Sequence, residues 1–350
     1  MSFHAARAVV REAIASAAFP AAVVEVGGVN DFLWREAFGR LTFDADATPA
    51  TEDTVFDLAS LTKVLSTTSL VMQQVERGTL ALDDPVAQHL ARWTGTDRET
   101  VTIRDLLAHC GGLTAYLPFF RDHRGRAEFE HAISSLPLEY APRTQSIYSD
   151  LGFMLLAFIL EDTGPAPLAD RFATLLAQMS IVERLQFNPP PQWRRDTAPT
   201  EQDAWRGRLL VGEVHDENTW ALGGVAGQAG LFGTAAAVGA YARHLLQVLD
   251  GRTGAFRRDT LATFIARRED VPGSSRALGW DTMLPTSSCG TKMSARAFGH
   301  TGFTGTSLWI DPDRGVYVVF LTNRVHPTRA NNQIKQVRPA LHDAVMDDLG

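Results

Sequence analysis

The sequence predicts an α/β fold of the α+β type: one antiparallel sheet built from both ends of the chain and flanked by helices, plus an inserted, mainly helical domain. Two observations predict it. Strand-like runs separated by turn residues lie near both termini, and the apolar residues between these regions recur with helical spacing. We therefore expect residues 1–60 and 215–350 to form the sheet domain and residues 61–214 the helical domain. The active site is expected at their junction, where pockets are common.

The N-terminal region is expected to contain one helix and two strands. Residues 5–18 have an amphipathic helical pattern, and residues 21–26 and 32–38 are predicted strands joined by the turn sequence Gly-Gly-Val-Asn-Asp. The apolar stretch after residue 12 also resembles a signal peptide, but Glu12 and Pro20 interrupt that pattern. We therefore expect a cytoplasmic protein; the alternative is a periplasmic or exported protein with an atypical signal.

The middle of the chain is predicted to be helical. Gly78 and Gly164 are suited to ending two of the helices, and Thr102 with Asp105 forms a capping-box pattern at the start of another. Residues 188–208 are rich in proline and charge, which favours a long surface loop. The predicted helices span residues 64–76, 102–109, 150–161, 166–179 and 234–249.

The C-terminal region returns to strands. Residues 306–310 and 316–322 are predicted strands, and the sequence Asp-Pro-Asp-Arg-Gly between them is a strong turn signal. A helix over residues 331–349 is expected to close the chain.

The composition excludes several classes of protein. Hydrophobic residues make up 45% of the chain and charged residues 21%, which indicates a globular protein with a core. The net charge of -7 gives no general attraction to nucleic acid or anionic membranes, and no apolar run is long enough to span a bilayer. Cys110 and Cys289 lack the spacing of metal ligands, so we expect two free thiols and no structural zinc.

The first candidate motif pairs Ser60 with Lys63. At the start of a helix, positions i and i+3 share a face, so the hydroxyl and the amine can approach each other. A serine hydroxyl needs a base to become a good nucleophile, and a lysine with a depressed pKa can act as that base. The chain has only three lysines against thirty arginines, and arginine could not serve because it does not deprotonate. The alternative is a chance pairing on a solvated helix face.

Two further motifs are weak when taken alone. Tyr148 and Asp150 precede a predicted helix, where they could offer a phenolic oxygen and an orienting carboxylate, or only an aromatic anchor and an N-cap. His300, Thr301 and Gly302 precede a predicted strand. Their small neighbours could leave backbone N–H groups open to a substrate, or the segment could be an ordinary turn into an edge strand.

In this order, the three motifs resemble the signatures of the serine β-lactamase and penicillin-binding protein family. The resemblance covers roughly residues 20–345 and is closest to the class C β-lactamase-related hydrolases and esterases. Part of the chain is similar to a bacterial subgroup that includes penicillin-binding-protein-4B-like carboxypeptidases and other β-lactamase-related hydrolases. The stretches that carry the wider resemblance are FDLASLTK (56–63), DLLAH (105–109), Leu113, GEVHDEN (212–218), GGVAG (223–227) and GLF (230–232).

The resemblance implies a reaction through an acyl-enzyme. Ser60 would be acylated, and Lys63 would accept or relay its proton. Tyr148 would work with Lys63 and protonate the leaving group, while Asp150 would hold Lys63 in place. No metal and no organic cofactor is implied.

The resemblance also implies the binding residues. The backbone N–H groups of Ser60 and Phe303 would form the oxyanion hole, and His300, Thr301 and Gly302 would face the substrate. The sequence departs from many β-lactamases in having Asp150 for an Asn and His300 for a Lys. An aspartate should hold the amine of the lysine protonated, and a neutral histidine attracts a substrate carboxylate less than a lysine does.

Signals for other enzyme classes are absent or weak. The chain has no GxSxG elbow, HExxH motif, P-loop or dinucleotide-binding fingerprint. His215, Asp216 and Glu217 could suggest metal ligands, but three adjacent side chains do not converge on one point, so a polar loop is expected. Trp193, Trp205 and Trp220 could line a substrate wall or anchor the loop.

The sequence therefore predicts a serine hydrolase that acts through a Ser60 acyl-enzyme on carboxylic esters or small amides. β-Lactams are a further candidate substrate. The alternative at the same site is a D-alanyl-D-alanine carboxypeptidase or a β-lactamase. The alternative of another class is a non-catalytic penicillin-binding-like sensor. No nucleic-acid partner is expected.

Overall fold

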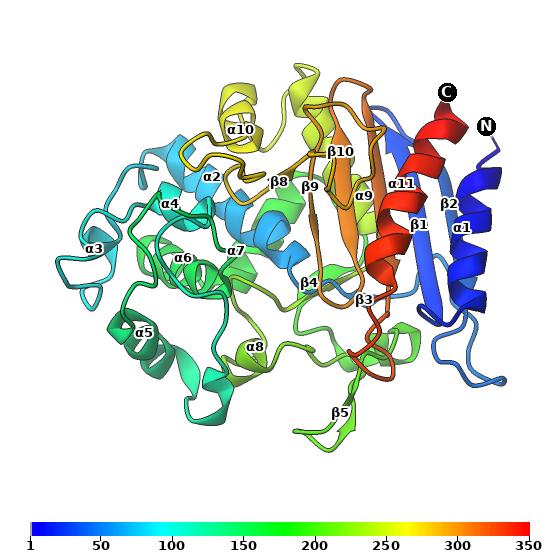
Figure 1. Ribbon diagram of the computed structural model, residues 1–350, viewed down its shortest axis with the longest axis horizontal. Coiled ribbons are helices and arrows are strands. Elements are labelled where there is room, and N and C mark those ends of the chain that lie inside the picture. Colours follow the sequence, from blue (N-terminus) through cyan, green and yellow to red (C-terminus); the bar gives the residue numbers. More distant parts are fainter. Residues whose placement is uncertain (1) are drawn as a thin grey trace.

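Strands from both ends of the chain pair in one sheet, as predicted. The computed structural model describes residues 2–350, and its main sheet is antiparallel with the order β2-β1-β11-β10-β9-β8 (Figure 1). These strands are β1 (Ala21–Gly28), β2 (Phe32–Gly39), β8 (Asp281–Thr282), β9 (Phe298–Thr301), β10 (Ser307–Asp311) and β11 (Val316–Thr322).

Both faces of the central strands are buried, because alternate residues enter two different cores. In the β1–β11 pair, Val24 lies opposite Phe320 and Val23 lies opposite Leu321. The first pair belongs to the core under the terminal helices, and the second pair belongs to the larger core on the other face. Successive side chains of a strand point to opposite faces, so the nearly continuous apolar runs of β1 and β11 fit a sheet that is covered on both sides.

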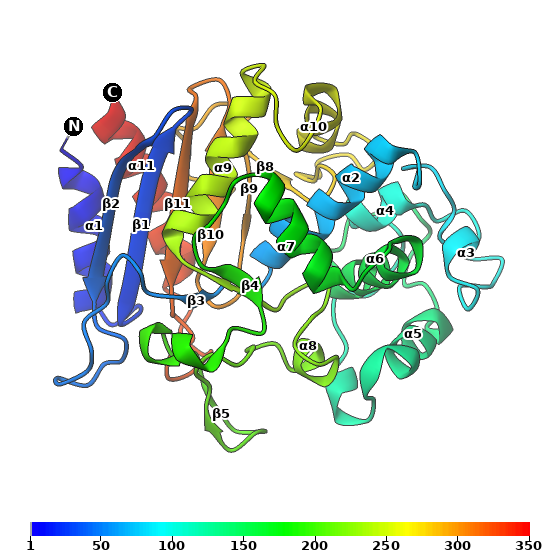
Figure 2. The same cartoon turned by 180° about the vertical axis from the view of Figure 1, so that it is seen from behind.

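Helices cover the two faces of the sheet. α1 (His4–Ala15) and α11 (Ile334–Leu349) lie side by side on one face, and α9 (Ala235–Leu249) packs on β1 and β11 from the other face (Figures 1 and 2). Gly239 allows the close approach of α9, since a Cβ at this position would lie 1.8 Å from Oε1 of the buried Glu25.

The inserted region packs on the α9 side and shares its core with the sheet. Its apolar centre is α6, in which residues 151–160 are all buried. The remaining helices are α2 (Ser69–Arg77), α3 (Val86–His89), α4 (Ile103–Leu107), α5 (Gly125–Ser135), α6 (Asp150–Thr163), α7 (Leu168–Gln178), α8 (Glu217–Ala221) and α10 (Arg258–Ile265).

Short elements connect these parts. β3 (Phe56–Asp57), β7 (Leu231–Gly233) and β4 (Leu185–Phe187) form a small sheet, and β5 (Gln202–Asp203) pairs with β6 (Arg208–Leu209). Three short helical segments complete the chain: η1 (Lys63–Thr68), which is π-helical, and the 3₁₀ segments η2 (Phe119–Arg121) and η3 (Pro191–Asp196).

Several local predictions are confirmed and others need correction. Thr102 and Asp105 form the capping box of α4, and Gly78 ends α2 in the left-handed conformation. The helix predicted from residue 64 begins as the π-helical η1, and the predicted loop over residues 188–208 contains η3 and β5. His300 and Thr301 end strand β9 instead of forming a turn before a strand.

The described residues contain two buried free thiols, Cys110 and Cys289. Over the same residues, no single helix combines the length and the apolar composition that crossing a membrane requires. Helices α6 and α7 reach the required length and apolar composition only when taken together, and the chain bends by 82° between them.

Candidate active site

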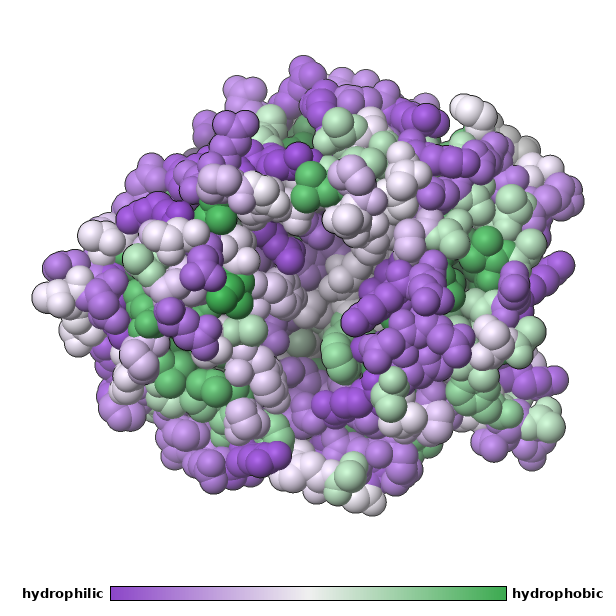
Figure 3. Space-filling model, in the orientation of Figure 1, coloured by the Kyte–Doolittle hydropathy of each residue, from purple (hydrophilic) through white to green (hydrophobic). Residues whose placement is uncertain are grey.

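A cleft of roughly 630 Å³ opens between the sheet and the helical region, and Figure 3 shows the hollow on that face of the molecule. Lys63 lies directly behind its wall and is fully buried. Segments far apart in the sequence thus bring all the predicted site residues together. Those that line the cleft are Ser60, Tyr148, Asp150, His300, Thr301, Gly302 and Phe303.

A tight turn between β3 and η1 presents Ser60. The preceding residue, Ala59, has a φ of 46°, a left-handed conformation that costs energy for a residue other than glycine. The buried carboxylate of Asp57 holds the turn, because it accepts hydrogen bonds from the N–H of Ala59 at 2.8 Å and of His215 at 2.7 Å. Sequence reasoning missed this role of Asp57, although the residue stands three positions before the serine.

Three acceptors surround the Nζ of Lys63. They are Oγ of Ser60 at 3.0 Å, Oδ1 of Asp150 at 2.6 Å and the carbonyl oxygen of Gln228 at 3.1 Å. An ammonium group has three N–H donors, so this environment matches the charged form of the lysine. Burial alone would lower the pKa of Lys63, but the negative charge of Asp150, together with Tyr148 and hydrogen bonds to both, raises it.

Tyr148 is the second proton-handling candidate, and its ring is enclosed by nitrogen-bearing side chains. The ring centroid lies 4.8 Å from Nζ of Lys63 and 5.1 Å from the guanidinium carbon of Arg276. The imidazole rings of His109 and His300 lie 4.6 and 5.7 Å away. Burial raises the pKa of Tyr148, while the charge of Lys63 and hydrogen bonding with Lys63 and Ser60 lower it in part.

These two pKa values define the resting site. Near neutral pH, Lys63 is an ammonium that donates to Ser60, and Tyr148 is a neutral phenol. Neither group can then take the proton of the serine until one of them has lost its own. The pair therefore acts as a coupled proton-transfer unit whose pKa values belong to both groups.

Two residues that line the cleft have unpaired backbone N–H groups. Neither Ser60 nor Phe303 donates its N–H to another residue between positions 2 and 350. The turn that carries Phe303 is tied to the backbone before the serine, because hydroxyl groups of Thr304 and Thr306 donate to the carbonyls of Asp57 at 2.7 Å and Leu58 at 3.0 Å. Paired N–H groups of this kind can bind a developing oxyanion.

Buried arginines support the turn from behind. Nη2 of Arg338, on α11, donates to the carbonyls of Gly302 at 2.7 Å and Thr306 at 2.8 Å. Nε of Arg324 donates to the carbonyl of Phe303 at 2.8 Å, with its guanidinium over the phenyl ring. A Cβ at Gly302 would lie 2.5 Å from the carbonyl oxygen of Leu58, so only glycine permits this approach.

His300 lies in the cleft as an uncharged side chain. Its Nδ1 is 2.9 Å from the carbonyl oxygen of Thr301 and must donate, since a carbonyl can only accept. Burial, with the nearby charges of Lys63 and Arg276, holds the pKa of His300 well below its usual value. The ring therefore supplies neither a positive charge nor a second N–H donor to the substrate.

The positive charge missing from His300 is present at Arg276, which sequence reasoning did not single out. Its guanidinium lines the cleft beside Tyr148 and forms no hydrogen bond or ion pair with any of residues 2–350. Arg276 lies in an irregular segment before β8, and nothing in its sequence neighbourhood distinguishes it from the other arginines.

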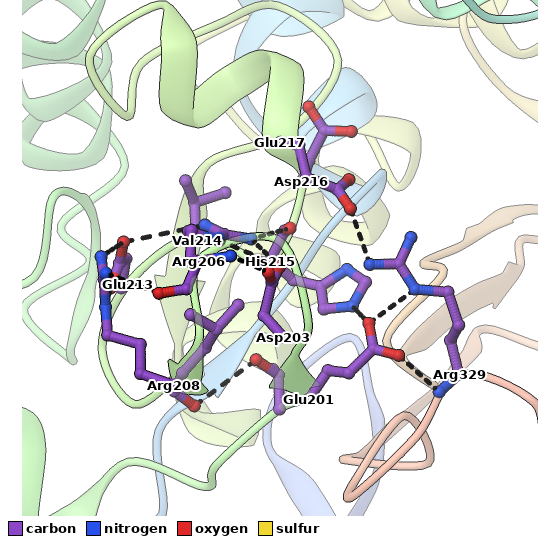
Figure 4. Close-up of polar contacts among 12 residues, drawn as sticks. Glu201, Asp203, Arg206, Arg208, Glu213, Val214, His215, Asp216, Glu217 and Arg329 are labelled. Carbon is purple, nitrogen blue, oxygen red and sulfur yellow. Dashed lines mark hydrogen bonds and ion pairs between the residues drawn. The ribbon is translucent and has the colours of Figure 1, made fainter. Parts of the chain in front are cut away.

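The candidate metal segment at residues 215–217 forms a polar network instead (Figure 4). Nε2 of His215 lies 2.9 Å from Oε2 of Glu201. Arg329 links Glu201 to Glu217, because its Nε donates to Oε2 of Glu201 at 2.5 Å and its Nη2 donates to Oε1 of Glu217 at 2.7 Å. Asp216 caps α8 through the N–H of Thr219. The three adjacent side chains thus make separate contacts, as expected for a polar loop.

Trp193 and Trp205 lie in the long loop and Trp220 lies in α8, and the three side chains pack against other aromatic residues or the small core. Trp205 contacts Trp220 at 5.3 Å and Phe120 at 4.6 Å between ring centroids. Trp193 packs beside the small core around Val55. None of them lines the cleft, so they anchor the loop.

Comparison with known proteins places the chain in a family. The family model described as Beta-lactamase matches residues 6–341. The chain is 30% identical over 349 residues to an Escherichia coli (strain K12) protein named "Putative D-alanyl-D-alanine carboxypeptidase", and the match covers 87% of this chain and 78% of that protein.

Solved structures share the fold at lower identity. EstCE1, described as a hydrolase with promiscuous acyltransferase activity, superposes with a TM-score of 0.78 at 21% identity over 98% of this chain and 97% of its own. A class C beta lactamase from Rhodobacter sphaeroides gives a TM-score of 0.77 at 19% identity over 99% of both chains. With the family model spanning nearly the whole sequence, the chain belongs to the β-lactamase family of serine hydrolases.

Proposed function

We propose that the protein hydrolyses carboxylic esters or small amides through an acyl-enzyme on Ser60. One observation carries the proposal: Oγ of Ser60 lies 3.0 Å from Nζ of Lys63, in a cleft that also presents the unpaired N–H groups of Ser60 and Phe303. A nucleophile, a proton acceptor and an oxyanion site within one cleft are the components of acyl transfer.

The reaction follows from these positions. The Lys63–Tyr148 pair acts as the base after it has lost one proton to solvent. Ser60 then attacks the substrate carbonyl, its proton passes to the deprotonated pair, and the carbonyl oxygen becomes an oxyanion held by the two N–H groups. Tyr148 then returns the proton to the leaving oxygen or nitrogen as the bond to the carbonyl carbon breaks. Water attacks the acyl-enzyme by the same proton route and releases the acid.

Intact mass spectrometry tests the proposal. The protein is exposed briefly to phenyl acetate, and Ser60→Ala is run beside it. We expect an acetyl adduct of about 42 Da and phenol release with the wild type, and neither with the variant. Hydrolysis that survives in Ser60→Ala would remove the nucleophile assignment, and equal thermal stability of the two proteins would exclude a folding defect.

A D-alanyl-D-alanine carboxypeptidase is the second candidate. Two observations favour it: the unpaired Arg276 in the cleft offers a charge for a substrate carboxylate, and the Escherichia coli relative carries that provisional name. The same mass experiment with benzylpenicillin separates the candidates. A stable penicilloyl adduct on Ser60 supports the peptidase, and rapid turnover of penicillin supports a β-lactamase.

A non-catalytic sensor is the remaining alternative. Its expected signature is the absence of any adduct or turnover with the ester and with penicillin. The contacts of Lys63 with both Ser60 and Asp150 argue for catalysis, because a binding protein has no need of a buried, fully coordinated ammonium beside its serine. The cytoplasmic location remains a prediction, which cell fractionation would test.

A further inference from the structure

Acidic side chains cluster at one end of the cleft. Asp150, Asp216 and Glu217 line this end around the half-exposed ring of Tyr116. Burial raises the pKa of the Tyr116 hydroxyl, and the charges of Asp216, Glu217 and Asp150 raise it further, while the charge of Arg329 lowers it in part. Figure 4 shows Asp216 and Glu217 at successive positions of the segment that leads into α8, next to Arg329 and His215.

Only one of these carboxylates lacks a cation. Asp150 pairs with Lys63 at 2.6 Å, and Glu217 pairs with Arg329 at 2.7 Å. Asp216 forms no ion pair with any residue from 2 to 350. Its two hydrogen bonds, from the N–H of Thr219 and Nε2 of Gln228, both end on Oδ1, at 2.6 and 3.3 Å. The hydroxyl of Thr219 also stabilises the carboxylate, so all the donors to Asp216 within the described chain are uncharged groups.

An acceptor without a partner lies beside Asp216. The side chain of Gln228 is 1% exposed, lines the cleft and directs its Nε2 to Asp216 and Thr219, while its Oε1 has no hydrogen-bond partner in residues 2–350. A buried polar atom without a partner is costly, and an acceptor is satisfied only by a donor. Burial and the negative charges of Asp150 and Glu217 also raise the pKa of Asp216, as expected where a cation is missing.

We propose that Asp216, Gln228 and Tyr116 form a subsite for a protonated amine on the substrate. The unpaired Oε1 of Gln228 is an acceptor, the local charge is negative, and the tyrosine ring adds a face that attracts cations, so an ammonium group satisfies all three. The inference rests on the proposed Ser60 chemistry and adds to it a substrate class: acyl groups that carry a free amine.

The subsite lies on the acyl side of the scissile bond. Tyr148, which protonates the leaving group in the proposed reaction, is surrounded by His109, His300 and Arg276. Asp216 contacts none of these three residues. It accepts a hydrogen bond from the side chain of Gln228, and the backbone carbonyl of Gln228 accepts one from Nζ of Lys63 at 3.1 Å. An amine bound at Asp216 is thus one glutamine away from Lys63 and belongs to the acyl group.

Paired ester substrates test the subsite. Phenyl esters of alanine and of 6-aminohexanoic acid are compared with their N-acetyl forms, with phenol release followed at pH 7. For the wild type, we expect kcat/KM to favour the free amine at one or both spacings. The ratio of kcat/KM for the amine ester to kcat/KM for its N-acetyl form should fall at least tenfold in Asp216→Asn. We expect this fall to come mainly from a higher KM for the amine ester. Intrinsic differences in ester reactivity cancel when the two proteins are compared.

The variant and its control are matched. Asparagine keeps the N-cap of α8, because it accepts the N–H of Thr219 as aspartate does. Glu213→Gln makes the same chemical change in the same loop, at a carboxylate that pairs with the exposed Arg208, and should leave the ratio as in the wild type.

The outcomes separate this inference from the proposed function. No preference for either amine in the wild type, or a preference that Asp216→Asn retains, overturns the amine subsite while acylation of Ser60 by phenyl acetate still stands. Absence of any Ser60 adduct or turnover overturns the proposed function, and the subsite inference with it.

Discussion

At the scale of single residues, the charge on Lys63 is the property that most affects the proposed chemistry. The carboxylate of Asp150 raises the pKa of Lys63 against the effect of burial. Replacing Asp150 with Asn keeps a hydrogen-bond acceptor and removes the charge, so the pKa of the amine should fall. We expect the ascending limb of kcat/KM against pH, measured with phenyl acetate, to move to lower pH by about 1–2 units.

A matched control uses another carboxylate of the same cleft. Asp281 lines the cleft but makes no contact with Lys63, so Asp281→Asn should leave the ascending limb in place. A limb that does not move in Asp150→Asn would mean that the Lys63–Tyr148 pair is not the group that titrates.

Arg276 gives a second prediction at this scale. With His300 neutral, Arg276 is the cation beside Tyr148 that is free to bind a carboxylate on the leaving group. We expect Arg276→Met to lower the ratio of kcat/KM for 3-carboxyphenyl acetate over phenyl acetate by about tenfold or more, the size of a hydrogen bond to a charged group. An unchanged ratio would show that the leaving-group carboxylate does not reach this arginine.

At the scale of elements, the packing of α9 on the sheet depends on a glycine. A Cβ at Gly239 would meet Oε1 of Glu25 at 1.8 Å and the ring of Tyr317 at 3.1 Å. These two side chains are buried and hydrogen-bonded at 2.7 Å, so they cannot easily move aside. We expect Gly239→Ala to lower the free energy of unfolding by about 1–3 kcal/mol, despite the better helix propensity of alanine.

Another helical glycine gives the opposite expectation. At Gly152, in α6, a Cβ would find its nearest neighbour at 3.6 Å, which is ordinary contact. Gly152→Ala should therefore raise the free energy of unfolding by about 0.5–1 kcal/mol through helix propensity alone. Urea denaturation of Gly239→Ala and Gly152→Ala measures both changes in the free energy of unfolding. If both variants were stabilised, or both destabilised, by similar amounts, the steric argument would be contradicted.

Elements also mark the limit of what the sequence can predict. Long periodic segments such as α6 and β11 were predicted because their apolar pattern extends over whole turns or strands. β3 and β8 have two residues each and exist only through pairing with distant strands, so they leave no local pattern. The same distinction applies to the site. Ser60, Lys63 and Tyr148 belong to recognisable motifs, whereas Arg276 and Gln228 enter the cleft only through the tertiary fold.

At the scale of the whole molecule, a charged network joins the long loop to the segment before α11. Glu201 accepts from the backbone N–H and Nε of Arg329 at 2.9 and 2.5 Å, and the N–H of Gln202 donates to the carbonyl of Pro327 at 2.9 Å. Arg329 also reaches Glu217 at the start of α8 (Figure 4). One edge of the cleft is thus held by contacts between segments more than a hundred residues apart.

This network should make stability depend on pH. Burial alone would raise the pKa of Glu201, but hydrogen bonds from His215 and Arg329 lower it to about 2, from 4.5. A carboxyl with a lower pKa in the folded state stabilises the protein above its unfolded pKa. That contribution is lost as the pH falls from 4.5 toward 2. We expect Glu201→Gln to lower the free energy of unfolding by about 1–2 kcal/mol at pH 7. This is less than the whole pKa shift of Glu201 would give, because Arg329 is partly exposed and solvent screens its charge.

Urea denaturation of both proteins at pH 7 and at about pH 3 measures this contribution. The difference between wild type and Glu201→Gln should shrink by more than half at the lower pH, where the wild-type carboxyl has lost most of its advantage over the unfolded chain. Glu213→Gln should show no comparable pH dependence, because the closer partner of Glu213 is the exposed Arg208 at 2.6 Å, and the buried Arg206 lies 3.7 Å away. A deficit in Glu201→Gln that is equal at both pH values would mean that shape and neutral hydrogen bonds, rather than charge, hold the loop to the C-terminal segment.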